Sequence, residues 1–155
     1  MAYQGQWQSG DVLTATDLNT FTPVTVLEFS GNISDATETL ISFTTEIVDV
    51  GDWHSNSTNP SRITPDVAGT YLATGHYSTG SSGVDYAFSR FYKNGSSVGA
   101  SIAQFSGTNI IGSHDIQFFL QMNGTTDYLE YKVYQASGAG RPGTIQFALQ
   151  LVAAS

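Results

Sequence analysis

From residue 25 onward, apolar and polar residues alternate in short runs that Gly, Asn, Ser and Pro separate. The clearest run, Ile145 to Leu151, has an apolar residue at almost every second position, which is typical of a strand with one buried face. Two Asn-Gly pairs, Asn94-Gly95 and Asn123-Gly124, predict tight hairpins because the central residues of a type I′ turn need positive φ. Short strands with such regular turns predict an all-β sandwich or barrel.

Several predicted strands carry large side chains on both faces. In one of them Tyr86 and Phe88 share a face, while Phe91 lies on the other. A sandwich sheet needs only one apolar face for its core, so a second aromatic face favours burial against another subunit. The residues expected to pack in the core or between subunits are Tyr71, Tyr86, Phe88, Phe91, Tyr92, Phe118, Tyr128, Tyr131, Tyr134, Phe147 and Leu149.

The first 24 residues differ from the rest of the chain. Residues 10–21 read as one short helical turn, in which Thr14 and Asp17 have the spacing of a capping box. A helix this short is marginal in water, so we expect it to order only against its own domain or against a partner. The sequence predicts an attachment arm over residues 1–24 and a head domain over residues 25–155. The apolar residues of the arm are Trp7, Val12, Leu13, Leu18 and Phe21.

The composition excludes several classes of function. The 155 residues include five Lys and Arg and thirteen Asp and Glu, which gives a formal net charge of −8. Because nucleic-acid binding depends on neutralising phosphates with Lys and Arg, we expect no nucleic-acid partner, and no docking on anionic lipid. No apolar run approaches the roughly 20 residues that span a bilayer, and no signal peptide is visible. The chain has no Cys, which excludes disulfides and thiolate chemistry.

Catalytic and metal-binding patterns are sparse in the sequence. Asp49, Asp52 and His54 lie close together, but their spacing matches neither a calcium loop nor a zinc site. The chain contains no Gly-x-Ser-x-Gly nucleophile turn and no Gly-rich phosphate loop that leads into a helix. We therefore expect no enzyme activity, no cofactor and no bound metal.

Three polar segments are candidates for ligand-binding loops at the apex of the domain: Gly51 to Pro60, Thr79 to Gly83 and Ser137 to Gly143. In the first of them, Trp53 is the aromatic residue best suited to stack on a sugar, and His54 lies beside it. These loops are the basis of a receptor-binding hypothesis.

Four motifs follow one another in a characteristic order. The chain reads Ile-Thr-Pro-Asp-Val-Ala-Gly-Thr-Tyr at 63–71 and Phe-Tyr-Lys-Asn-Gly-Ser-Ser-Val at 91–98. An Asn-Gly turn with its flanking strands spans 120–135, and the last strand spans 144–151. In combination these motifs resemble the jelly-roll heads of the tumour necrosis factor (TNF) and complement globular-head superfamily. The resemblance covers about residues 27–152 and implies a TNF-like jelly-roll β-sandwich that assembles as a homotrimer.

The N-terminal sequence resembles a second group of proteins. Residues 7–19 read Trp-Gln-Ser-Gly-Asp-Val-Leu-Thr-Ala-Thr-Asp-Leu-Asn, which is similar to the opening of bacteriophage structural proteins that carry fibre and appendage modules. Together the two resemblances imply a virion protein made in the bacterial cytoplasm. It would be a homotrimeric capsid decoration or cement protein, or a short head fibre, that binds a phage capsid or appendage protein through its arm. The alternative is a fibre tip that recognises a host-surface glycan or protein.

Overall fold

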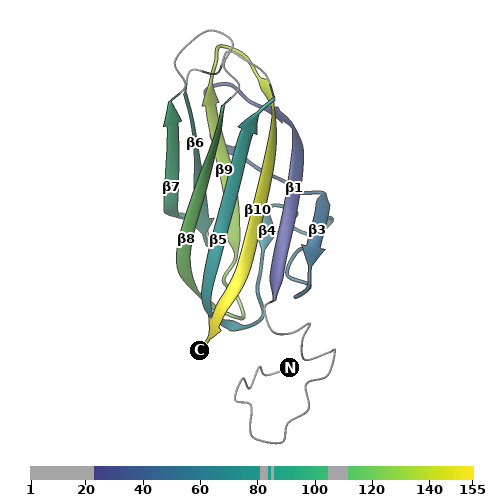
Figure 1. The fold of residues 1–155 in the computed structure, drawn as a ribbon. Helices are drawn as coiled ribbons and strands as arrows, with labels where there is room; N and C mark the ends of the chain where they lie inside the picture. Colours follow the sequence, from purple (N-terminus) through teal and green to yellow (C-terminus); the bar gives the residue numbers. More distant parts are fainter. Residues whose placement is uncertain (1–22, 81–83, 85, 105–111) are drawn as a thin grey trace, which may run out of the picture.

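The computed structural model describes residues 23–80, 84, 86–104 and 112–155, and these residues form two packed β-sheets (Figure 1). Sheet A contains, in spatial order, β3 (Thr45–Asp49), β1 (Val24–Ile33), β10 (Arg141–Ala154), β5 (Ala68–Thr79) and β8 (Ser113–Asn123). Sheet B contains β2 (Thr39–Leu40), β9 (Leu129–Ala136), β6 (Tyr86–Lys93) and β7 (Ser96–Gln104), and the short β4 (Arg62–Ile63) also pairs with β9. Every ladder between these strands is antiparallel.

Apart from the β6–β7 hairpin, strands that follow one another in the chain alternate between the two sheets. The first strand, β1, pairs with the last, β10, and β10 pairs on its other side with β5 from the middle of the chain. The hairpin of β6 and β7 lies in sheet B, β8 returns to sheet A, β9 lies in sheet B, and β10 closes sheet A (Figure 1). This order is that of a jelly-roll sandwich, so the predicted fold class is confirmed.

The alternation of residues along β5 shows how the sequence specifies this arrangement. Tyr71, Ala73 and Tyr77 are fully buried, whereas the intervening Leu72 and His76 are half-buried on the other side of the sheet. Because successive side chains of a strand point to opposite faces, this pattern fixes which side of sheet A faces sheet B.

An aromatic cluster joins the two sheets at the centre of the core. The ring centroid of Phe147 on β10 lies 5.7 Å from the ring centroids of both Phe91 on β6 and Tyr131 on β9. Phe91 and Tyr131 are 5.4 Å apart, and Phe43 contacts Phe147 at 5.6 Å. Each such pair contributes about 0.5–1.5 kcal/mol beyond the burial of its area, so this cluster fixes how the sheets pack.

The residues predicted to pack in the core or between subunits divide into two groups. Those buried in the core are Tyr71, Phe91, Tyr131, Phe147 and Leu149, and Phe118 packs half-buried against them. Those half-buried outside the core, on sheet B or beside it, are Tyr86, Phe88, Tyr92, Tyr128 and Tyr134. The expectation that β6 carries aromatic residues on both faces is confirmed.

Only the first Asn-Gly pair makes a tight hairpin. Asn94 and Gly95 have φ values of 51° and 78°, as a type I′ turn requires. The second pair begins a longer connection, because β8 ends at Asn123 and β9 starts at Leu129. The Asn123 carboxamide oxygen accepts hydrogen bonds from the backbone N–H groups of residues 125–127 at 2.9–3.0 Å. The prediction of a tight turn here is wrong because this side chain organises a wider loop.

A polar cluster is enclosed between the sheets. Nε2 of His114 on β8 lies 2.9 Å from the Ser89 hydroxyl on β6, and the His114 ring packs on Tyr77 with ring centroids 5.5 Å apart. Nδ1 of His114 and the hydroxyls of Tyr77 and Tyr131 are buried without a hydrogen-bond partner among the residues described. Burial disfavours the charged imidazolium and lowers the pKa of His114 to about 4.

We predict that His114 makes the fold sensitive to acid. The unfolded histidine, with a pKa near 6.5, binds a proton that the buried side chain resists, so stability falls as the pH drops from about 6.5 towards 4. His114 should lower the free energy of unfolding of the wild type by about 3 kcal/mol between pH 7 and pH 4. The His114→Gln variant should lack this contribution. Urea denaturation at both pH values measures this difference. The half-exposed His76→Gln serves as the control, and an unchanged pH dependence in His114→Gln would contradict the prediction.

Candidate functional site

The exposed side of sheet A, which we call face A, is the candidate functional site. The strand register places its outward side chains in rows that cross β1, β10, β5 and β8. The three central rows are Val24–Gln150–Leu72–Phe119, Val26–Ala148–Thr74–Gln117 and Glu28–Gln146–His76–Asp115.

Face A is almost free of charge, although the chain is strongly acidic. In the three rows only Glu28, His76 and Asp115 are titratable, and the other nine side chains are apolar, amide or hydroxyl groups. His76 Nδ1 lies 2.7 Å from an Asp115 carboxylate oxygen, so two of the three titratable groups bind each other. Protein interfaces are depleted of charge at their centre, and face A has this composition.

A large aromatic side chain protrudes from this uncharged face. Phe119 on β8 is 61% exposed, and it pairs across the strands with the half-buried Leu72. Val152, beyond the last row on β10, is 54% exposed. An exposed Phe beside Leu on a face with few charges makes face A a candidate site of protein association.

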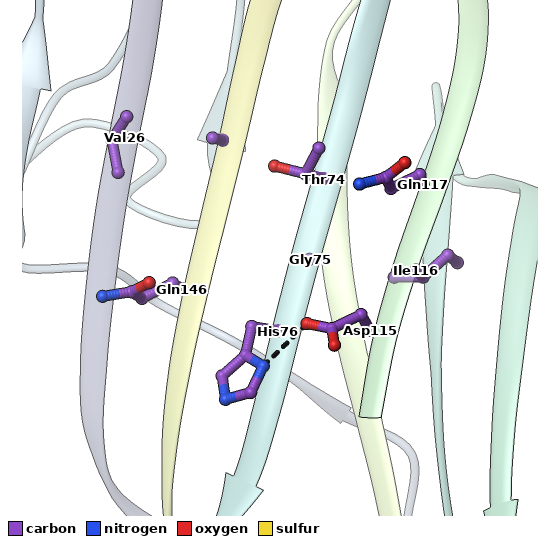
Figure 2. A pocket seen from close by; sticks show the side chains of 9 residues that line it. Val26, Thr74, Gly75, His76, Asp115, Ile116, Gln117 and Gln146 are labelled. Atoms are coloured by element: carbon purple, nitrogen blue, oxygen red, sulfur yellow. Dashed lines mark hydrogen bonds and ion pairs between the residues drawn. The ribbon is translucent and has the colours of Figure 1, made fainter. Parts of the chain in front are cut away.

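A shallow depression of about 370 Å³ lies in the middle of face A (Figure 2). Its apolar lining comes from short side chains, among them Val26, Thr74 and Ala148, which leave room above the sheet. Gln146 and the His76–Asp115 pair also line it (Figure 2). Face A therefore carries both a protrusion, Phe119, and next to it a depression whose lining reaches Gln117 on the same strand.

The exposed side of sheet B is built differently. The Phe88 and Tyr134 rings stack with centroids 4.8 Å apart and an interplanar angle of 5°. The Arg90 guanidinium lies 4.4 Å from the Phe88 centroid, and the Lys132 ammonium lies 3.9 Å from that of Tyr92. Rings on this side are covered by one another and by cations of the same chain, so their half-burial needs no second subunit.

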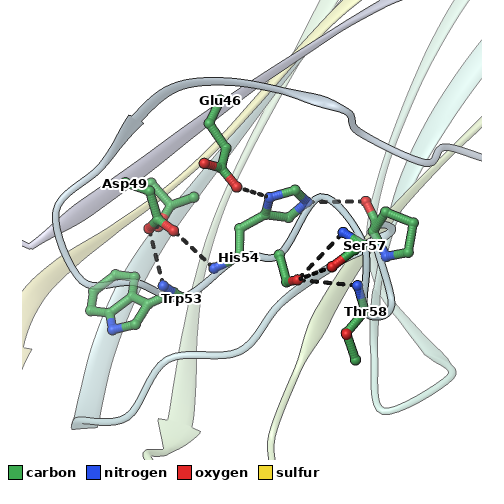
Figure 3. Close-up of polar contacts among 9 residues, drawn as sticks. Glu46, Asp49, Trp53, His54, Ser57 and Thr58 are labelled. Atoms are coloured by element: carbon green, nitrogen blue, oxygen red, sulfur yellow. Dashed lines mark hydrogen bonds and ion pairs between the residues drawn. The ribbon is translucent and has the colours of Figure 1, made fainter.

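In the loop from residue 51 to residue 60, Trp53 and His54 are buried in the domain, whereas residues 56–59 are exposed (Figure 3). Trp53 is only 3% exposed, its indole Nε1–H donates to Asp66 at 2.9 Å, and its ring packs edge-on against Tyr71. The buried His54 has both ring nitrogens engaged, at 2.7 Å from the Glu46 carboxylate and 3.1 Å from a backbone carbonyl oxygen. The expectation of an exposed sugar-stacking Trp53 is wrong, because these contacts bury the ring.

The three candidate loops do not meet at one place. Gly80 N–H donates to Pro142 O at 2.7 Å, so Gly80, directly after β5, lies beside the beginning of β10 at one end of the sandwich. The loop at 51–60 packs on the beginning of β5 instead, through Trp53 and Tyr71. A ligand site made of all three loops is therefore excluded by the arrangement of the strands.

The structure describes neither a metal-binding cluster nor a membrane-spanning helix, and the predicted arm residues lie outside the described ranges. Residues 23–80, 84, 86–104 and 112–155 contain no group of three His, Asp or Glu side chains placed to hold a metal ion. They also contain no helix long and apolar enough to span a membrane. The arm residues Trp7, Val12, Leu13, Leu18 and Phe21 fall in the part of the chain that the structure does not describe.

Phe119 and Leu72 were not among the residues that the sequence analysis selected. The sequence does indicate that Phe119 lies on the outer side of its strand. Ile116, Phe118 and Leu120 occupy alternate positions on the core side of β8, which leaves Phe119 as the one aromatic residue between two glutamines on the outer side.

Comparison with known proteins relates the fold to solved structures. No protein-family model and no curated protein sequence matches the chain. The globular domain of the zebrafish complement 1qA protein is 14% identical, with a TM-score of 0.58, over 86% of this chain and 99% of that one. The PRD1 vertex protein P5 is 15% identical, with a TM-score of 0.64, over 84% of this chain and 73% of that one. Eiger TNF from S. frugiperda is 12% identical, with a TM-score of 0.58, over 86% of this chain and 95% of that one. The chain has the TNF-like jelly-roll fold.

We predict that Trp53 stabilises the fold and binds no ligand. Trp53→Ala removes a buried ring and leaves the Asp66 carboxylate without its indole donor, which should lower the free energy of unfolding by about 4 kcal/mol. The matched control is Leu40→Ala, at a 41% exposed residue, with an expected change below about 0.5 kcal/mol. Urea denaturation measures the free energy of unfolding of both variants. If Trp53→Ala loses as little as Leu40→Ala, the prediction is wrong and Trp53 remains a candidate for ligand binding.

Proposed function

We propose that the chain is a structural virion protein of a bacteriophage: a homotrimeric capsid decoration or cement protein, or a short head fibre. The observation that carries the proposal is face A, a sheet face with few charges and an exposed Phe119 in a chain of net charge −8. The likeness to a vertex protein of the phage PRD1 and the arm motif at residues 7–19 support the virion role. Its mechanism is burial of surface, without chemical turnover.

The protrusion and the depression of face A suggest how copies of the chain associate. Phe119 stands on β8, at one edge of sheet A, and the depression extends from β1 across β10 and β5 to Asp115 and Gln117 on β8 itself. If Phe119 of one copy enters the depression of the next, each copy uses a different patch on each side, which is a head-to-tail contact. Such contacts close into a ring when the rotation between copies allows it. We propose a ring of three copies.

The charge of the chain limits which surface can serve as this interface. Three chains at −8 each give −24, so acidic surfaces repel one another when copies come together. Face A has nine uncharged side chains in its three central rows, so bringing this face against another copy adds little charge repulsion. Burying the exposed Phe119 ring contributes about 2 kcal/mol for each contact.

We also propose that the segment before β1 is an attachment arm and the rest of the chain a head; the predicted boundary moves from residue 24 to residue 23, because Val24 already pairs with Gln150 in sheet A. The chain enters the domain where Pro23 O accepts from Leu151 N–H at 3.0 Å, close to the C-terminus of β10 (Figure 1). The loops around Gly80 and Pro142 lie at the opposite end. The arm would bind a capsid or appendage protein of the virion, and the opposite end would project from the particle.

We expect Phe119→Arg to break the trimer. Three guanidinium groups would have to be buried at an apolar contact, so the variant should run as a folded monomer of about one-third of the wild-type mass. Leu40→Arg, which places the same charge on an exposed apolar residue of sheet B, should keep the wild-type mass. Light scattering on a sizing column measures both masses. A trimeric Phe119→Arg variant would show that face A is not the interface.

The arm is tested separately by deleting residues 2–20. The truncated protein should remain a folded trimer, because face A lies outside the deleted segment, and should no longer cosediment with phage particles that lack the protein. Full-length protein in the same assay is the control. Truncated protein that still cosediments with the particles would disprove the attachment role of the arm.

A further inference from the structure

Exposed apolar side chains gather on the edge strand β3. Ile47 is 49% exposed, Val48 is 37% exposed, and Val50, directly after the strand, is 51% exposed. They are three of the six large hydrophobic side chains that are exposed in the described part of the chain. Val48 also pairs with Val26 of face A, so the apolar surface is continuous from β1 onto β3.

The chain protects this edge only in part. β3 pairs with β1 on one side, and no described strand pairs with its other side. Natural edge strands are commonly protected by Lys or Pro, by short length, by a bulge or by a covering segment. β3 (Thr-Glu-Ile-Val-Asp) is short and its ladder with β1 has a register shift, but it contains no Lys and no Pro. Its carboxylates face the loop that follows, where Glu46 binds His54 and Asp49 accepts from Thr25 and two backbone N–H groups (Figure 3). The apolar residues of β3 therefore lack a cover among the described residues.

The N-terminal segment is attached directly beside this edge. Val50 N–H donates to Val24 O at 3.1 Å, and the residues before 23 continue from that point. Phe21 is three residues before Val24, and three extended residues span about 10 Å, so its side chain can reach Val50. β3 has five residues and is about 16 Å long, so the ten residues from 12 to 21 suffice to run its whole length.

We propose that residues 12–21 of each chain cover the β3 edge of that same chain when the protein is free. Val12, Leu13, Leu18 and Phe21 of the segment would pack on Ile47, Val48 and Val50. This contact would shield the apolar side chains of both the arm and β3 from water. On attachment to a particle, the arm would leave the β3 edge and bind its virion partner instead. The proposal concerns the free protein and goes beyond the attachment role, because the arm can cover β3 whether or not it binds a virion.

The test uses a photo-cross-linking residue in the full-length protein. p-Benzoylphenylalanine replaces Ile47 in one variant and Leu40, on the edge of sheet B, in the matched control. After illumination of the purified protein, mass spectrometry should locate cross-links from position 47 within residues 12–21, at least tenfold above those from position 40. The product should migrate as a single chain on a denaturing gel.

Three outcomes would overturn the proposal. Cross-links from position 47 that reach only residues 25–155 would show that the domain of a neighbouring copy covers β3. A two-chain band that contains residues 12–21 would show that the arm covers a neighbour and not its own chain. Equal yields from positions 47 and 40 would show that nothing specific covers the edge. A variant with Val12, Leu13, Leu18 and Phe21 changed to Ser should lose the cross-links. None of these outcomes depends on particle binding, so they leave the attachment role to its own assay.

Discussion

The aromatic contact between the two sheets is the interaction on which the rest of the structure depends. Phe147 from sheet A packs on Phe91 and Tyr131 from sheet B, and all three rings are fully buried. Because side chains alternate along a strand, fixing these residues inward also fixes which residues face outward. Phe119 is exposed for that reason: Phe118, its neighbour on β8, is directed at the core.

The outer faces of the two sheets differ in how far their aromatic and apolar side chains are covered by the same chain. Four of the five Lys and Arg residues, Arg62, Arg90, Lys93 and Lys132, lie on strands of sheet B, and three of them cover aromatic rings of the same chain. Face A has no such cover for Phe119, and its few charges are largely paired in His76 and Asp115. A single chain thus completes sheet B but leaves face A with apolar surface for another molecule to bury.

The strands could be predicted from the sequence to a large extent, because alternation is a local property. The run from Ile145 to Leu151 is a strand of the core, and Asn94-Gly95 is a tight turn, as predicted. The second turn was mispredicted because the contacts of the Asn123 side chain, and not the Asn-Gly pair, decide its length. The burial of Trp53 could not be read locally either, since its partners Asp66 and Tyr71 lie beyond its own loop. Face A needed the register of four strands that are far apart in the chain.

The most direct test of the account is hydroxyl-radical footprinting of the native protein, read at Phe119 against Phe88 and Tyr134. The exposure of a single chain would make Phe119 one of its most reactive aromatic residues, because 61% of it is accessible. Burial of face A between copies predicts instead that Phe119 is protected in the native protein, while the rings on sheet B, which stay at the surface, are oxidised. Rapid oxidation of Phe119 in native protein at working concentration would contradict the account.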